Sequence, residues 1–362
     1  MSNAVRKWND FSLSMGWVTP QFSRGRVDAA GNALINEPLL QSDYETALSV
    51  INNWRSSHAY PLQCLKMTLL QRAKSIDPKA IIAQRLKRLV SIRAKLQRFS
   101  QMKMSQMQDI GGCRAVVASI HHVERLVGLY EKNILRGAEF IEKYDYIKQP
   151  KIDGYRGVHL VYKYRSTLSA HQTYNGLRIE IQLRSRLQHA WATAVETAST
   201  FTGQALKSNI GTDQWKRFFA IVGSAFAIRE NKPIVPGTIP DKNELVREIR
   251  TLSHELKVEI LLERWGTAIH YVSQHTGDAD AFLLELDPHA SVIRVTGFPN
   301  SALKAATERY LIAEKEAAQK PGAQAVLVSV KSVQALKSAY PNYYLDSRHF
   351  LAAMRVVISQ PL

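Results

Sequence analysis

The sequence predicts an α+β fold in which helices flank a mixed β-sheet, followed by a smaller α+β domain. Apolar residues at helical spacing dominate the chain up to about residue 75. From there to about residue 184, strand-like and helical segments alternate with glycine-containing loops, which is typical of helices packed against one sheet. A segment rich in proline then precedes a second series of short strands.

The elements of the first domain follow from their residue patterns. Strand-like alternation predicts strands over residues 113–119, 138–144, 158–165 and 177–184. Two further helices, over 186–200 and 213–230, carry aromatic and aliphatic residues at helical spacing, which indicates core packing.

Residues 231–242 contain three prolines and one glycine, the strongest shift in composition along the chain. We therefore place a domain boundary near residue 236, between domains 1–236 and 237–362. The second domain begins with a charged helix over about 243–264. Its other predicted elements are strands at 268–273, 281–287, 291–298 and 325–332 and a helix at 301–319.

Composition excludes several classes of protein. No stretch approaches the roughly 20 apolar residues of a membrane span, and the N-terminal residues lack the pattern of a signal peptide. We therefore expect a cytoplasmic protein. Cys64 and Cys113 show no metal-site spacing and are expected to be reduced thiols. His121 and His122 open a helical pattern without neighbouring ligands, so a metal site there is not favoured.

Charge points to a polyanionic partner. The formal net charge is +17, and between Trp54 and Arg98 eleven Lys or Arg residues accompany one acid, Asp77. Solvated helix faces usually mix both signs, so this excess favours a phosphate-binding surface for nucleotides or nucleic acid.

Residues 85–98 place several side chains that can bind phosphate at a spacing that lets them act together. Arg85 and Lys87 alternate as on one face of a strand, while Ser91, Lys95 and Arg98 share one face of the helix that follows. A strand end, a helix N-terminus and cationic side chains can converge on a triphosphate.

Two acids are candidates for a Mg²⁺ site. Asp109 precedes two glycines and a strand that carries Arg114; it is either a metal ligand or a turn-capping residue. Glu180, Gln182 and Arg184 project from one face of a strand whose other face is apolar, so they need partners or a cleft. Glu180 could share the metal with Asp109 or accept the proton of an attacking hydroxyl.

Between these acids lies a loop with Lys148, Lys151, Tyr155, Arg156 and His159. A tyrosine flanked by cations suits stacking against a base while its neighbours hold phosphate, although it could instead pack the loop.

Taken in order, the patterns RxKxxxSIxxK, DIxGxR, PKxxGYRxxH and EIQLRS followed by QHAWA resemble the synthetase domain of the RelA/SpoT family, including the small alarmone synthetases. The resemblance covers most of residues 40–230. It implies a synthetase-like, nucleotidyltransferase-like fold and transfer of the β,γ-pyrophosphate of ATP to a ribose 3′-hydroxyl with Mg²⁺. Nothing resembles the family's hydrolase domain.

The resemblance also implies roles for individual residues. Arg85, Lys87, Ser91 and Lys95 would hold the ATP phosphates, Arg114 would lie against the adenine, and Asp109 with Glu180 would manage the metal. The acceptor nucleotide would be received by Lys151, Tyr155, His159, Gln182 and Arg184.

Two departures concern the acceptor. Asp153 stands where many alarmone synthetases have an uncharged polar residue, and Gly157 stands where serine is common. A different acceptor is therefore plausible. The toxic small alarmone synthetases, which this arrangement resembles, modify the 3′-CCA end of tRNA and stop translation.

In length and layout the chain resembles the CapRel group, which fuses such a toxin domain to an antitoxin-like domain and defends against phage. Tyr340 and Tyr343 form a YxxY pattern with Pro341 between them. The resemblance implies that this motif occludes the ATP site until a phage protein, typically capsid, binds the C-terminal domain. A simple turn joining two strands is the alternative.

Three hypotheses therefore remain open. The first is a tRNA-targeting pyrophosphokinase, either a monomer or an oligomer, that is inhibited by its own C-terminal domain. The second is a (p)ppGpp synthetase that uses GDP or GTP. The third is an RNA-binding protein without activity, against which Asp109, Glu180 and the phosphate-binding segment argue.

Overall fold

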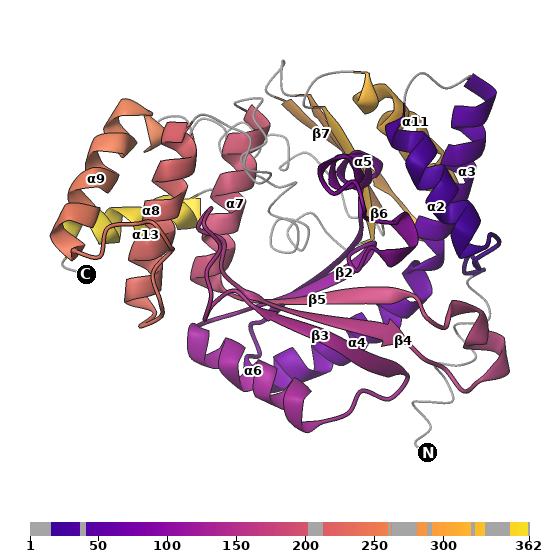
Figure 1. Cartoon of the computed structure of the whole chain (residues 1–362), viewed down its shortest axis with the longest axis horizontal. Coiled ribbons are helices and arrows are strands. Elements are labelled where there is room, and N and C mark those ends of the chain that lie inside the picture. Colours follow the sequence, from indigo (N-terminus) through magenta and orange to yellow (C-terminus); the bar gives the residue numbers. More distant parts are fainter. Residues whose placement is uncertain are drawn as a thin grey trace.

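The computed structural model describes residues 16–36, 41–201, 213–259, 262, 281–287, 292–319, 323–329 and 348–360. A five-stranded sheet lies at its centre in the order β1-β2-β5-β4-β3 (Figure 1). Strands β2 and β5 are parallel, and the other neighbouring pairs are antiparallel. The predicted α+β fold with a mixed sheet is confirmed. The strands are β1 (Ile81–Leu86), β2 (Gly111–Val117), β3 (Ala138–Asp145), β4 (Val158–Tyr164) and β5 (Arg178–Ser185).

Helices α4 (Ala59–Ile76) and α6 (Ile120–Lys132) cover one face of this sheet (Figure 1). Strand β5 alternates as its sequence predicts: Ile179, Ile181 and Leu183 are fully buried in the core with these helices. The polar residues between them project to the opposite face. That opposite face carries the candidate site.

The N-terminal helices support the segment that follows β1. Helix α2 (Arg24–Ile35) packs against α3 (Gln41–Ser57) and against α5 (Leu89–Arg98). The hydroxyl of Ser23 accepts a hydrogen bond from the Arg26 backbone N–H and so caps α2. The described residues also contain three short 3₁₀ helices, η1 (Met104–Gln106), η2 (Ser169–Tyr174) and η4 (Asn300–Ala302).

A second apolar cluster joins four helices beside the sheet: α7 (Arg186–Phe201), α8 (Asp213–Arg229), α9 (Lys242–Glu255) and α13 (Arg348–Ser359). Phe350 of α13 is fully buried against Phe218, Phe219 and Phe226 of α8. Helices from both sides of residue 236 thus share one core, and the domain boundary at that position stays a prediction. Helix α13 was not anticipated from the sequence.

The remaining C-terminal elements form a small α+β unit. Strands β6 (Ala281–Asp287), β7 (Val292–Phe298) and β8 (Gln324–Ser329) form an antiparallel sheet in the order β7-β6-β8. Helix α11 (Leu303–Ala318) packs on this sheet through Ala313, next to Leu283 and Ala325. The predicted strand at 268–273 and the YxxY segment lie outside the described residues.

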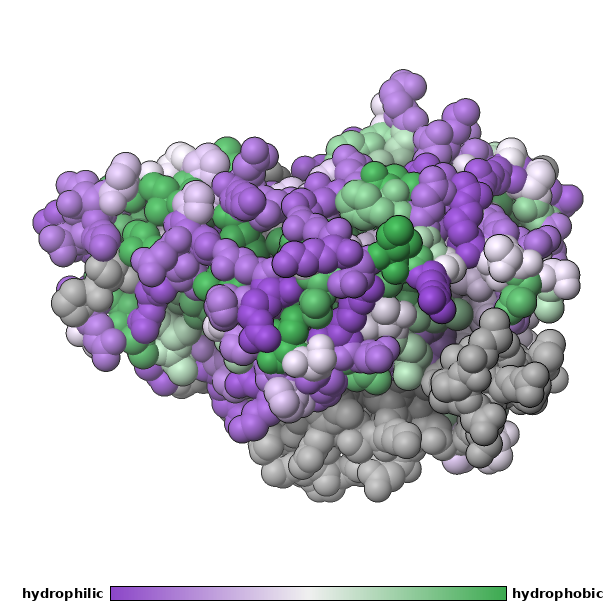
Figure 2. Space-filling view, turned by 90° about the horizontal axis from the view of Figure 1, so that it is seen from below, coloured by the Kyte–Doolittle hydropathy of each residue, from purple (hydrophilic) through white to green (hydrophobic). Residues whose placement is uncertain are grey.

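The surface agrees with the composition. The face seen in Figure 2 is mainly hydrophilic, and its apolar side chains form small separate patches. In the part of the chain that the structure describes, none of the helices combines the length and apolar character needed to cross a membrane. Cys113 is buried, Cys64 is partly buried, and both are free thiols.

Candidate active site

A cavity of about 280 Å³ opens on the sheet face opposite α4 and α6. Eight of the residues selected from the sequence line it: Arg85, Asp109, Arg114, Lys151, Tyr155, His159, Gln182 and Arg184. A smaller adjoining cavity of about 30 Å³ is lined by Glu180 together with Arg85, Asp109, Arg114 and Gln182. Residues distant in sequence therefore meet at one place because β2, β4 and β5 are adjacent strands.

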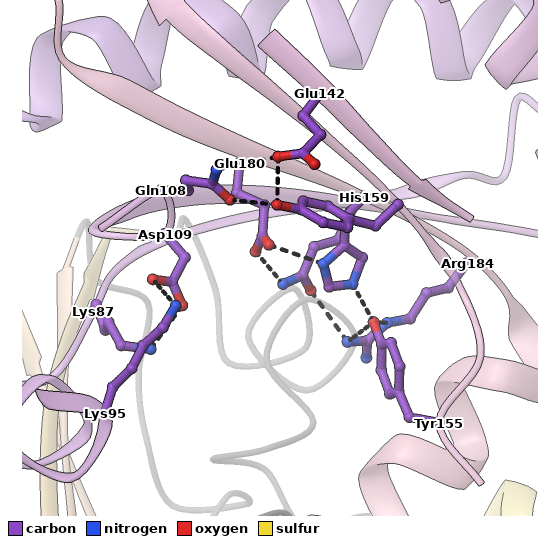
Figure 3. A network of polar contacts seen from close by, with 11 residues as sticks. Lys87, Lys95, Gln108, Asp109, Glu142, Tyr155, His159, Glu180 and Arg184 are labelled. Carbon is purple, nitrogen blue, oxygen red and sulfur yellow. Dashed lines mark hydrogen bonds and ion pairs between the residues drawn. The ribbon is translucent and has the colours of Figure 1, made fainter. Parts of the chain in front are cut away.

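The first half of the site is a cluster of cations around Asp109 (Figure 3). Lys87 Nζ lies 2.7 Å from Asp109 Oδ2, and Lys95 Nζ lies 3.0 Å from Asp109 Oδ1. Burial by itself would raise the pKa of Asp109, but the charges of Lys87 and Lys95 outweigh it and hold that pKa well below its usual value. Asp109 is therefore an anion within reach of two ammonium groups.

The second half is a hydrogen-bonded chain that runs from β5 to the loop before β4 (Figure 3). Glu180 Oε1 lies 2.8 Å from His159 Nδ1, and His159 Nε2 lies 2.5 Å from the Tyr155 hydroxyl. Arg184 Nη2 donates to the same hydroxyl at 2.9 Å. The chain fixes the Tyr155 ring against the sheet from two sides.

Burial and neighbouring charges act in opposite directions on the pKa values of His159, Tyr155 and Glu180. Burial would lower the pKa of His159, but Tyr155 and Glu180 raise it to about 9, so its imidazole is protonated at neutral pH. Burial would raise the pKa of Tyr155, but the charges of Arg184 and His159 lower it to about 8. For Glu180, His159 outweighs burial and holds the pKa below its usual value.

Gln182 links Glu180 and Arg184, the two ends of this series of hydrogen bonds. Its Nε2 donates to Glu180 Oε2 at 2.6 Å, and its Oε1 accepts from Arg184 Nη2 at 3.1 Å. It is the cross-strand neighbour of Arg114 on β2 and of His159 on β4. The period-two pattern of β5 thus places three polar side chains in one row along the cavity.

The loop that carries Tyr155 depends on a glycine. Gly154 has φ +95°, and a Cβ there would lie 2.8 Å from the Phe219 carbonyl oxygen and 2.8 Å from the Trp191 ring. The carboxylate of Asp153 accepts a hydrogen bond from the Tyr155 N–H at 2.9 Å and completes the turn. The cation of Lys151 lies 5.3 Å from the centre of the Tyr155 ring.

The donor set fits Mg²⁺. Asp109 and Glu180 line the same small cavity, and the negative charge of Asp109 is close enough to act on the pKa of Glu180. Mg²⁺ typically takes one or two carboxylates together with substrate phosphate oxygens. Among the described residues, no group of three or more His, Cys, Asp or Glu side chains is placed to hold a metal ion by itself.

Comparison with known proteins identifies the central segment. Residues 84–204 match the family model described as the region found in RelA/SpoT proteins. These residues form a RelA/SpoT synthetase domain. The match implies an ATP-dependent pyrophosphotransferase, so the predicted enzyme class is confirmed. No curated protein matches the chain.

Solved structures of limited similarity include three small proteins. Small alarmone synthetase 1 from Bacillus subtilis, bound to its product pppGpp, is 21% identical over 48% of this chain and 88% of its own, with a TM-score of 0.40. A GTP pyrophosphokinase family protein from Streptococcus pneumoniae is 24% identical over 48% and 86%, with a TM-score of 0.38. Small alarmone synthetase 2 from Bacillus subtilis is 19% identical over 58% and 95%, with a TM-score of 0.38.

Part of the cavity wall lies beyond the RelA/SpoT segment. Lys216 and Phe219 of α8 line it together with Trp191 and Val195 of α7. The Trp191 Nε1–H donates to the Phe219 carbonyl at 2.9 Å, which joins the two helices behind Tyr155. Sequence reasoning assigned these aromatic residues to the core and missed Lys216, which no local pattern distinguishes from other exposed lysines.

The remaining predicted residues are placed as follows. Ser91 lies in the first turns of α5 and is half-buried, between the two lysines that bind Asp109. Tyr340 and Tyr343 lie outside the described residues, so the structure places neither of them.

Proposed function

We propose that this protein transfers the β,γ-pyrophosphate of ATP to the 3′-hydroxyl of the tRNA CCA end in the cytoplasm and thereby blocks translation. The observation that carries the proposal is that two groups of residues meet at two adjoining cavities: a cationic half, in which Lys87 and Lys95 surround Asp109, and a half built on Glu180, His159 and Tyr155. Such a division suits a polyphosphate donor on one side and a nucleoside acceptor on the other.

The donor would bind through Arg85, Lys87, Ser91 and Lys95, with Arg114 against the adenine. Lys87 and Lys95 release Asp109 when phosphate oxygens replace its carboxylate, and Asp109 is then available as a metal ligand. Mg²⁺, held by Asp109 and Glu180, would neutralise charge on the transferred group. Catalysis is then chiefly positioning and charge neutralisation.

The acceptor ribose would lie beside Glu180 with its base on Tyr155. The 3′-oxygen forms a bond to the β-phosphorus of ATP, the bond from that phosphorus to the oxygen shared with the α-phosphorus breaks, and AMP leaves. If Glu180 is not bound to the metal, its carboxylate would accept the proton of the hydroxyl. His159 packs edge-on against the Tyr155 ring, and His159 and Arg184 both bond its hydroxyl, which fixes the orientation of the ring before the acceptor arrives.

Two observations favour tRNA over a free guanine nucleotide. Asp153 lines the acceptor side of the cavity, and its negative charge opposes the 5′-phosphates of GDP or GTP. The chain as a whole carries a net charge of +17, which suits a long polyanion. The second candidate, a (p)ppGpp synthetase, is favoured by Lys151 and Lys216, which line the same cavity and could hold acceptor phosphates.

We further propose that the C-terminal region inhibits the enzyme until a phage protein, most simply the capsid protein, binds it. The support is the fused layout and the YxxY pattern of Tyr340 and Tyr343. Release follows if the partner binds the detached region better than the docked one.

One experiment separates the candidates. The full-length chain is incubated with γ-labelled ATP, Mg²⁺ and either deacylated tRNA or GDP and GTP, with and without purified phage capsid protein. Label on tRNA supports the proposal, and label on the guanine nucleotide supports the alternative. Label on neither substrate under any condition contradicts both. Glu180→Gln serves as the inactive control.

A further inference from the structure

Arg55 is a buried cation that none of the predicted roles uses. It lies on α3, outside the RelA/SpoT segment, and is 5% exposed. Its Nε donates to the Lys87 carbonyl at 3.0 Å, and its Nη1 donates to Asn52 Oδ1 at 2.9 Å. These two bonds orient the guanidinium beside the start of α5.

The remaining donors of Arg55 meet the C-terminal region. Glu314 Oε2 of α11 lies 3.2 Å from Arg55 Nη1, and the Tyr310 hydroxyl accepts from Arg55 Nη2 at 2.6 Å. The other oxygen of Glu314 accepts the Leu89 N–H, the first N–H of α5, at 3.0 Å. One carboxylate is therefore held by a guanidinium and a helix N-terminus, the combination that proteins use for phosphate.

The position of this carboxylate is informative. Leu89 follows Lys87 by two residues and precedes Ser91 by two, so the Glu314 carboxylate contacts the segment to which the donor phosphates are assigned. Both members of the ion pair are more than nine-tenths buried, with Glu314 7% exposed. An anion at this place is stabilised by Arg55 and by the helix dipole.

We propose that Arg55 and the N-terminus of α5 form a subsite for a phosphate group of the nucleotide donor, and that the Glu314 carboxylate occupies this subsite in the resting chain. The proposal rests on the proposed use of ATP at this site. Polyphosphate and the Glu314 carboxylate of α11 then compete for the Arg55 guanidinium and the Leu89 N–H. Binding of either one therefore weakens binding of the other.

The docking of α11 suits such an exchange. Its apolar side packs on its own sheet around Ala313, while Tyr310 and Glu314 reach Arg55. Removing a carboxylate from a buried guanidinium is costly when nothing replaces it. A phosphate oxygen restores both the counter-charge and the hydrogen bond to Leu89, so displacement by nucleotide is far less costly than simple undocking.

The test measures binding without any acceptor. The affinities of the full-length chain for a non-transferable methylene-bridged ATP analogue and for inorganic tripolyphosphate are compared with those of Glu314→Gln. We expect the variant to bind both ligands about tenfold or more tightly, because a neutral amide competes poorly for a guanidinium. Glu316→Gln is the matched control, because it removes the same charge from an exposed position of the same helix that pairs with Arg309.

A second variant examines the subsite itself. In the Glu314→Gln background, Arg55→Gln should reverse the gain, and Tyr310→Phe alone should give a smaller gain than Glu314→Gln. Thermal unfolding of each variant verifies folding. Equal gains in Glu314→Gln and Glu316→Gln, or an undiminished gain after Arg55→Gln, would overturn the proposal. Tight analogue binding without transfer to tRNA would instead count against the proposed acceptor alone.

Discussion

At the scale of single residues, the contacts of Tyr155 suit its proposed role of stacking against the acceptor base. Its hydroxyl is held by His159 at 2.5 Å and by Arg184 at 2.9 Å, while its ring packs at 6.4 Å from Trp191 in an edge-on arrangement. A ring fixed in this way loses little conformational entropy when a base stacks on it. The ring and the hydroxyl therefore have separable functions.

Substitutions at Tyr155 should separate them. Tyr155→Ala should abolish transfer because the stacking surface is lost. Tyr155→Phe should keep acceptor KM within a few-fold but lower stability by about 1–3 kcal/mol, since it leaves buried donors of Arg184 and His159 unsatisfied. Steady-state kinetics and urea unfolding measure the two effects. An unaltered kcat/KM for Tyr155→Ala would contradict the assigned role.

His58 couples stability to pH. It is 1% exposed, its Nδ1 lies 2.7 Å from the Trp54 carbonyl, and burial lowers its pKa to about 4. Below pH about 6.5 the unfolded chain binds a proton at this histidine that the native chain does not. Stability that is present above that pH is therefore lost as the pH falls toward 4, by about 3 kcal/mol in full.

Urea unfolding across this pH window tests the role of His58. His58→Gln should be less stable than the native chain at neutral pH and should show a shallower fall in unfolding free energy on acidification. His121→Gln, which alters an exposed histidine on α6, should keep the native slope. The same steepness in all three proteins would exclude His58 as the cause.

At the level of elements, one carboxylate ties the end of α8 to the loop that carries Tyr155. Glu230, just after α8, forms an ion pair with the buried Arg156 and accepts from Ser185 Oγ at 2.5 Å and from Gln188 Nε2 at 3.1 Å. These partners lie in the Tyr155 loop, at the end of β5 and in α7. Glu230 thus fixes the positions of the Tyr155 loop, β5 and α7 relative to one another.

Glu230→Gln should loosen this connection. We expect acceptor KM to rise about tenfold while affinity for the ATP analogue stays native, because the cationic half depends on α5 and β2 instead. Glu248→Gln, which weakens the tie between α8 and α9 through Arg217, is the matched control. A parallel loss of ATP affinity in Glu230→Gln would show a general structural defect.

For the whole molecule, two separate proposals concern control of the site by the C-terminal region. Helix α11 reaches the start of α5 in the structure, whereas the YxxY motif is known only from sequence. Competition of Glu314 with phosphate and occlusion of the adenine site by the motif are independent hypotheses, because each concerns different residues and a different part of the nucleotide.

Tyr343→Ala tests the motif. If the motif covers the adenine site, the variant should transfer pyrophosphate to tRNA without any trigger, since the competing rings are removed. Labelled-ATP transfer in the absence of capsid protein is the readout, and Tyr344→Ala is the neighbouring control. A folded Tyr343→Ala chain that remains silent until capsid protein is added would argue against the motif.

The sequence by itself predicted most of the local elements and most of the residues that line the cavity. Period-two alternation on β5 separated Ile179, Ile181 and Leu183 from Glu180 and Gln182, and the cations after β1 indicated phosphate binding. These features are local, because a strand turns alternate side chains to opposite faces wherever it packs. The sequence of α13 did not lead us to predict a helix, although its Phe350 is part of the apolar cluster formed with α7, α8 and α9.

Only the tertiary structure decided which distant residues meet. Strand order placed Glu180 beside His159, the packing of α8 brought Lys216 to the cavity, and α11 carried Glu314 to Arg55. Such pairings depend on how buried surfaces fit and how buried charges are compensated across long stretches of chain. A local pattern contains no information about either, and for that reason the partner of Arg55 could be found only in space.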